Sequence, residues 1–187
     1  PFNAIRLELP RDLPGMDRYR NAKNTMDDWL SQGILMPDAR ESVYVYEQEF
    51  TLDAGSFCRT GFISLQRLDK KRILTHEQTR KKAKADREQL IGTLKTYTSF
   101  IFGLYDDKER GIRQAIAGAP RETVYDFTDE QGIKTKFYRI SDAGSIRDIV
   151  ALVEKKNIYI ADGHHRLDVS YRLGVSHAPF YLTDMYD

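Results

Sequence analysis

The sequence predicts an α+β fold in which helices flank a mixed β-sheet, and three observations lead to this prediction. Segments rich in Val, Ile, Tyr and Phe alternate with amphipathic segments, as in chains that interleave strands and helices. Two pairs of strand-like segments are joined by short turns, at residues 53–55 and 129–132, which is typical of β-hairpins. Hairpin strands are antiparallel, so we expect a mixed sheet and not the parallel sheet of a doubly wound fold.

The individual elements follow from the spacing of apolar residues. In residues 17–32 they recur at helical spacing and Gly33 follows as a C-cap, while Ser145 is predicted to cap the helix at 146–154. The predicted helices are residues 17–32, 79–96, 111–117, 146–154 and 167–173. The predicted strands are residues 42–50, 58–65, 100–105, 123–127, 134–140, 157–161 and 180–183.

Composition limits the class of protein. A chain of 187 residues with 41% hydrophobic and 30% charged residues is expected to form one α+β domain over residues 1–187. Its 29 basic and 28 acidic residues nearly cancel, so any affinity for phosphate must be local and we do not expect nucleic acid as a partner. The single Cys58 excludes an internal disulfide and predicts a cytoplasmic protein. No apolar run is long enough to span a membrane, so we expect no membrane partner.

The stretch IADGHHRLDVS at residues 160–170 places a turn, residues 162–166, between a short strand and a helix. The start of a helix offers free backbone N–H groups and the positive end of the helix dipole, which together attract anions. Gly163 lets a phosphate approach the backbone closely, Arg166 can donate two hydrogen bonds to it, and His164 and His165 can donate further ones. The turn is therefore a candidate phosphate or nucleotide site.

Asp162 does not suit a bare anion site, because its charge repels phosphate. It suits the site better if a metal ion or a substrate ammonium lies between them. A plainer interpretation, which the composition leaves equally open, is that Asp162 caps the helix and that His164 and His165 are surface residues.

A second candidate segment reads HEQTR at residues 76–80. It begins like the zinc-binding HExxH motif, but Arg80 stands where the second histidine is required, so that metal site is absent. Glu77 can serve as a general base beside a substrate hydroxyl. Arg80, Lys84 and Arg87 share one face of the predicted helix, and such a run of charge is more often a solvated surface than a binding site.

Through these two motifs, the chain resembles the bacterial and archaeal domain-of-unknown-function family numbered 1015, whose members carry YIADGHHR and HExTR segments. SVYVYEQEF, TGFISL, VYDFTDEQG and FYLTDMYD also stand in the order of that family. Members usually have an upstream segment with a PPYDV-like motif and a further second half. Together with the initial Pro1, this implies that the chain is the N-terminal to central part of a longer protein.

The family is similar to the ParB/sulfiredoxin-type fold, in which a strand–turn–helix unit holds nucleotide phosphates. This resemblance implies that Asp162, Gly163, His164, His165 and Arg166 bind phosphate. His164 occupies the position of the reactive cysteine of sulfiredoxins, and Cys58 lies in another element, so we do not expect sulfiredoxin chemistry. Kinases that phosphorylate free serine carry a DGHHR-like turn and are the nearest match in residue chemistry.

The resemblance implies a nucleotide-dependent phosphotransferase acting on a small hydroxyl compound such as free serine. Glu77 and His164 are the candidate catalytic residues. The candidate substrate-binding residues are His76, Thr79 and Arg80. Mg²⁺ with ATP, ADP or another phosphate donor is the expected cofactor set.

Two alternatives from other classes remain open. One is a ParB-like nucleotide-binding switch associated with DNA, which the near-neutral charge and the lack of a helix-turn-helix pattern count against. The other is a metal-dependent hydrolase using His76, His164 and His165. Adjacent histidines on a helix point in different directions, which counts against this second alternative.

Overall fold

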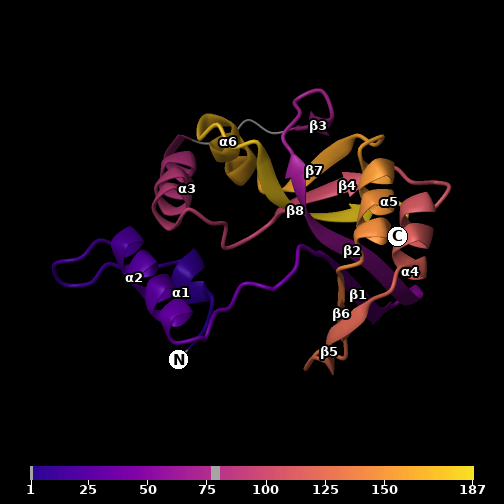
Figure 1. The fold of residues 1–187 in the computed structure, drawn as a ribbon, viewed down its shortest axis with the longest axis horizontal. Coiled ribbons are helices and arrows are strands. Elements are labelled where there is room, and N and C mark those ends of the chain that lie inside the picture. The colour runs from indigo at the N-terminus through magenta and orange to yellow at the C-terminus, as the bar shows by residue number, and fades with distance from the viewer. Residues whose placement is uncertain (1, 77–80) are drawn as a thin grey trace.

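The computed structural model describes residues 2–76 and 81–187, and its central feature is an eight-stranded mixed sheet (Figure 1). The strand order is β3-β7-β4-β8-β2-β1-β6-β5. The pairs β3/β7 and β4/β8 are parallel and the other neighbours are antiparallel. The predicted α+β class with a mixed sheet is therefore confirmed.

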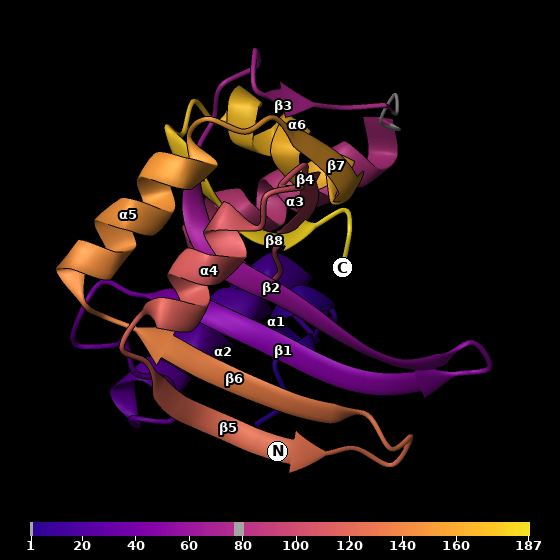
Figure 2. The ribbon, with the colours of Figure 1, turned by 90° about the vertical axis from the view of Figure 1, so that its right-hand side faces the viewer.

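The strands lie close to the predicted positions. They are β1 (Val43–Leu52), β2 (Gly55–Arg67), β3 (Ile73–Leu74), β4 (Ile101–Tyr105), β5 (Glu122–Thr128), β6 (Lys134–Ile140), β7 (Ile158–Asp162) and β8 (His177–Asp184). The predicted hairpins are β1–β2 and β5–β6, whose tips project beyond the helices in Figure 2. Cys58 lies on β2 and is exposed.

The helices flank the sheet. They are α1 (Ile5–Glu8), α2 (Arg18–Ser31), α3 (Lys81–Leu94), α4 (Gly111–Gly118), α5 (Ala143–Val153) and α6 (His164–Arg172). In Figures 1 and 2, α4 and α5 lie side by side on one face of the sheet, while α1, α2 and α3 gather on the other side. None of the helices in the described ranges has the length and apolar character needed to span a bilayer.

The main core lies between the sheet and the helices α4, α5 and α6. Phe62, Ile101, Ile160 and Phe180 fill its centre, with Leu167 contributed by α6. A second, smaller cluster lies between α2 and α3, built from Ala22, Leu90 and Leu94 with Tyr19 and Met26 beside them. The α6 helix packs against α3 as well as the sheet, so it joins the two parts of the molecule.

The structure corrects two predicted helix starts. The N-cap of α5 is Asp142, not Ser145; the Ser145 N–H and hydroxyl both donate to the Asp142 carboxylate, at 2.8 and 2.9 Å. The helix α6 begins at His164, three residues earlier than predicted, with Gly163 as its N-cap and no capping side chain. Asp162 is the last residue of β7, so the interpretation of Asp162 as a helix cap is wrong.

Two further features concern the exposed side of α5 and the short helix α1. Val150 of α5 is 42% exposed, whereas Ile149 and Val153 of the same helix are buried. The short helix α1 was not predicted from the sequence. Its Leu7 is buried and the helix packs against α2, so tertiary contacts hold it in place.

Candidate functional site

Gly163 forms the bend between β7 and α6. Its φ of +88° lies in the left-handed region, which glycine adopts at little cost. A Cβ at this position would lie 3.1 Å from the Ile101 Cα and 3.0 Å from the Arg166 Nη2. The backbone of β4 and the arginine therefore exclude a side chain here, and α6 starts close against the sheet.

The guanidinium of Arg166 is held on two sides. Its Nη2 donates to the Asp162 Oδ2 and its Nη1 donates to the Ser99 Oγ, both at 3.0 Å. Its Nε is buried and has no hydrogen-bond acceptor among the described residues. The arginine is thus fixed beside the start of α6, with its charge partly balanced by Asp162, whose side chain is 76% exposed.

The two adjacent histidines occupy different environments. His164 is buried, at 7% exposure, whereas His165 is half-buried, and its Nδ1 is shielded from solvent without a partner in the described part of the chain. Successive residues of a helix point in different directions, which accounts for the difference. His164 contacts His76, the described residue of the other predicted motif.

That contact joins the two motifs. The rings of His76 and His164 meet edge to face, with centroids 4.7 Å apart and an angle of 90° between the ring planes. His76 is the second residue after β3 and His164 is the second residue after β7. These two strands pair in parallel, so their carboxyl ends lie at the same edge of the sheet. Glu77, Thr79 and Arg80 lie outside the described residues. Across residues 2–76 and 81–187, no group of three His, Cys, Asp or Glu side chains is placed to hold a metal ion.

A pocket of about 460 Å³ extends from His164 along one side of α6. Leu167 and Tyr171 of α6 line it together with Ile73 and Thr75. Lys70 lines the Tyr171 end, with its Nζ 4.9 Å from the ring centroid. The volume is in the range of small-molecule sites, which occupy about 300–1,000 Å³. A pocket that includes the buried histidine makes this region the candidate site.

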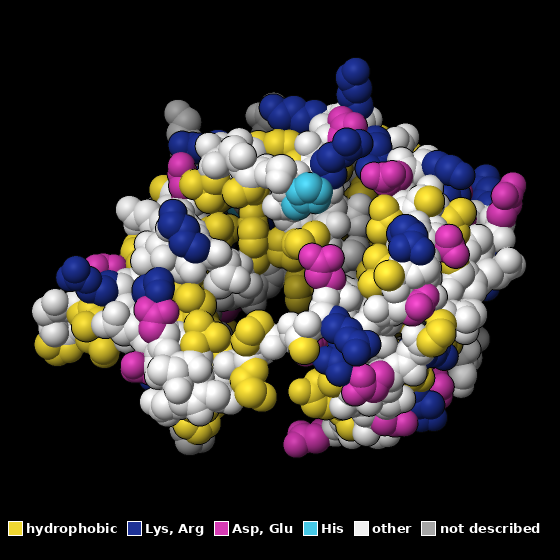
Figure 3. All heavy atoms as spheres, in the orientation of Figure 1, with side chains coloured by type: hydrophobic (Ala, Val, Ile, Leu, Met, Phe, Trp, Pro, Cys, Tyr) yellow, Lys and Arg dark blue, Asp and Glu magenta, His cyan; other side chains and the backbone are white. Residues whose placement is uncertain are grey.

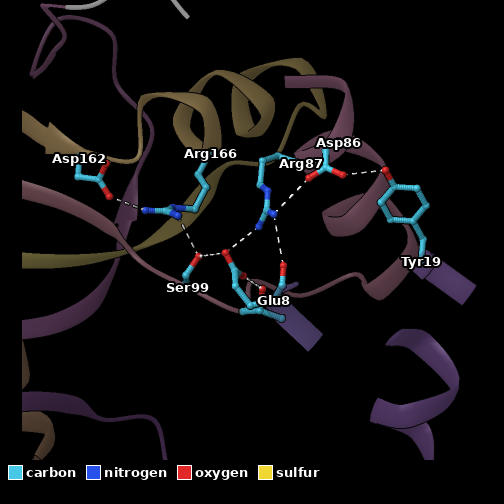
Figure 4. Close-up of polar contacts among 8 residues, drawn as sticks. Glu8, Tyr19, Asp86, Arg87, Ser99, Asp162 and Arg166 are labelled. Carbon is cyan, nitrogen blue, oxygen red and sulfur yellow. Dashed lines mark hydrogen bonds and ion pairs between the residues drawn. The ribbon is translucent and has the colours of Figure 1, made fainter. Parts of the chain in front are cut away.

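A polar network continues from the turn into the N-terminal helices (Figure 4). Ser99, which accepts from Arg166, donates to the Glu8 Oε1 at 3.1 Å, and Arg87 donates to the same oxygen at 2.7 Å. Arg87 also pairs with Asp86 at 3.2 Å, and the Tyr19 hydroxyl donates to Asp86 at 2.9 Å. The network therefore connects β7 and α6 to α3, α1 and α2.

The basic face predicted on α3 is largely engaged within the protein. Lys84 pairs with Asp168 of α6, and Arg87 pairs with Glu8 and is only 17% exposed. Over α4 and α5, Lys and Arg side chains are interspersed with Asp and Glu (Figure 3). Ion pairs of this kind leave little unbalanced positive charge for a polyanion.

Comparison with known proteins decides the family. Residues 1–179 match the family described as "Protein of unknown function (DUF1015)". The chain belongs to the DUF1015 family. Neither the curated proteins nor the solved structures gave a match to it.

The DUF1015 chain brings together residues that its motifs predicted and residues that they did not. Gly163, His164, Arg166 and His76 came from the motifs, and they lie around one turn. Glu8, Ser99, Lys70 and Tyr171 were missed, because single charged, hydroxyl and aromatic residues carry no spacing signal. The sequence indicated only that other residues must pack against α6, the helix that follows the DGHHR turn.

Proposed function

We propose that this protein is a nucleotide-dependent phosphotransferase that acts on a small hydroxyl compound, with free serine as the leading candidate. The observation that supports the proposal best is the contact between His76 and His164, because it brings the first residue of the HEQTR segment to the DGHHR turn. A phosphotransferase needs an acceptor site and a phosphate site next to each other, since phosphoryl transfer depends mainly on positioning and charge stabilisation.

The start of α6 is the proposed phosphate site. The first backbone N–H groups of a helix have no acceptor within the helix, and Gly163 leaves them uncovered by a side chain. Arg166 stands beside them with its guanidinium fixed by Asp162 and Ser99. His164 and His165 add ring N–H donors at the start of the helix, where the resemblance to ParB/sulfiredoxin-type turns implies phosphate binding.

Asp162 fits a Mg²⁺ ion that is bound mainly by phosphates and water. The ion usually takes one or two protein carboxylates, and Asp162 offers an exposed carboxylate at the end of β7. When bound, Mg²⁺ would neutralise phosphate charge. Glu77 would accept the proton of the acceptor hydroxyl, and Thr79 and Arg80 would hold the acceptor. A cytoplasmic location agrees with the free Cys58.

Isothermal titration with ATP, ADP, CTP and pyrophosphate, each with Mg²⁺, tests the phosphate site. We expect at least one to bind, and Arg166→Ala to weaken its binding tenfold or more, the loss of about 1.4 kcal/mol. Arg147→Ala is the matched control, because Arg147 is an exposed arginine of α5, a helix that carries none of the proposed site residues. Binding by none of the four, or equal binding by wild type and Arg166→Ala, would reject the proposal.

A further inference from the structure

The pocket along α6 has two ends, and only one of them belongs to the proposed phosphate site. His164 stands at the first end, and Lys70 and Tyr171 stand at the second. His164 and Tyr171 are two helical turns apart, which is about 10 Å along an α-helix. A free amino acid is too short to reach both ends, whereas a nucleoside diphosphate is long enough.

The second end of the pocket carries a polar group that lacks a hydrogen-bond partner. The Tyr171 hydroxyl is buried and has no hydrogen-bond partner among the described residues. A buried hydroxyl without a partner is costly, so such a group in a pocket wall favours a ligand that supplies the partner. Burial, and after it the charge of Asp69, raises the pKa of Tyr171, so the hydroxyl stays protonated and can donate at neutral pH.

Among the described residues that line the pocket, the charged groups leave Lys70 available to donate hydrogen bonds to a base or a ribose. Asp168 is paired with Lys84, and Arg172 with Glu88 at 3.2 Å. Lys70 has no carboxylate partner within the described ranges, and its exposed side chain lies against the Tyr171 ring, from which it can swing away. Ile73 and Leu167 line the pocket between the two ends and are almost fully buried, so they form its floor.

We propose that this pocket binds the nucleoside half of the phosphate donor, with Tyr171 and Lys70 contacting the base or the ribose while the phosphates reach the start of α6. The inference builds on the proposed function and adds two residues, Lys70 and Tyr171, that neither motif contains. His164 lies at the junction between nucleoside and phosphates.

The test separates the two ends of the ligand. Titrations use pyrophosphate, ADP, CDP, adenosine and cytidine on the wild-type chain, on Lys70→Met and on Tyr171→Phe. Lys71→Met and Tyr159→Phe are matched controls, because Lys71 neighbours Lys70 and Tyr159 is an exposed tyrosine of β7, and neither lines the pocket. Melting curves without ligand show whether each variant remains folded.

We expect ADP or CDP to bind more tightly than pyrophosphate. We also expect Lys70→Met and Tyr171→Phe to weaken the diphosphate and its nucleoside about tenfold, while pyrophosphate binding and both controls stay unchanged. If pyrophosphate binds as tightly as ADP and CDP, or the pocket variants bind both diphosphates like wild type, the nucleoside assignment is wrong and the phosphate site stands. If a nucleoside binds and pyrophosphate does not, the phosphate site is wrong and the pocket assignment stands. If no probe binds, both are rejected.

Discussion

Glu8 and Arg87 form the ion pair at the centre of the polar network, with the Arg87 Nη1 2.7 Å from the Glu8 Oε1. Both side chains are largely shielded from solvent, at 22% and 17% exposure. Glu8 also accepts hydrogen bonds from Thr98 and Ser99, and Ser99 accepts one from Arg166. Through this carboxylate the N-terminal helix α1 is linked to the turn that starts α6 (Figure 4).

Glu8→Ala should destabilise the protein, because it leaves the Arg87 Nη1 and two hydroxyl groups without their acceptor. We expect a loss of about 2 kcal/mol in the free energy of unfolding, measured by urea denaturation. Glu49→Ala is the control: Glu49 pairs with Lys134 at 3.6 Å and is 56% exposed, so its loss should change stability by less than about 0.5 kcal/mol. Equal effects of the two substitutions would show that the Glu8 network contributes no more than a surface pair.

Gly163→Ala should destabilise the turn for two reasons, the left-handed backbone and the contact with Ile101. Gly174 has a φ of +68° but open space around it, so Gly174→Ala reports the backbone cost alone, about 1–2 kcal/mol. We expect Gly163→Ala to lose more than this, as measured by thermal and urea unfolding. Equal losses would mean that the Ile101 contact relaxes without cost.

Asp184 provides a test of pH dependence. It is 4% exposed, and burial raises its pKa, although the backbone N–H groups of Asp107 and Tyr186 oppose the shift. A carboxyl whose pKa is higher in the folded protein adds stability below its unfolded pKa, and that stability is lost as the pH rises through the folded value.

Asp184→Asn removes this titration and retains an oxygen for the two N–H groups. We therefore expect its melting temperature to exceed that of the wild type at pH 7, with the difference shrinking as the pH falls toward 4. Asp126→Asn, at an exposed position of β5, should show no such trend. A wild type that is more stable than Asp184→Asn at pH 7 would contradict the assignment.

Glu77→Gln tests the catalytic half of the proposed function. A general base acts in the transition state, so the substitution should reduce turnover with serine and a bound nucleotide by about 100-fold or more and leave nucleotide affinity unchanged. His165→Ala should weaken nucleotide binding itself. Glu109→Gln, at an exposed position before α4, is the control. Unchanged turnover in Glu77→Gln would remove this residue from the mechanism.

The basic residues of α3 should not form a DNA-binding surface, because Lys84 and Arg87 are paired with Asp168 and Glu8. Gel-shift titration at low salt should show no retarded band at micromolar protein. Tight binding with a steep salt dependence, lost in Lys84→Met, would instead favour the ParB-like switch.

The sequence was sufficient to predict features that depend on residues close together along the chain. Alternating and helical spacing of apolar residues predicted most of the strands and helices, and the DGHHR and HExTR motifs predicted the family that the match over residues 1–179 shows. The start of α6 was misplaced because Gly163 caps it through its left-handed backbone, and no capping side chain signals such a start. Ser145 was mistaken for a cap because Asp142, three residues earlier, is equally suited to capping.

The amino-acid sequence by itself determined the mixed α+β class, the strand–turn–helix unit at residues 158–172 and the residue types gathered in its two motifs. The tertiary structure alone decided that His76 meets His164, that Arg166 is fixed by Asp162 and Ser99, and that Lys70 and Tyr171 close one end of a pocket. The physical reason is the sequence separation of the residues that interact. Helix and strand periodicities are set by near neighbours along the chain, whereas these contacts depend on the order in which β3, β7 and β4 pair in the sheet.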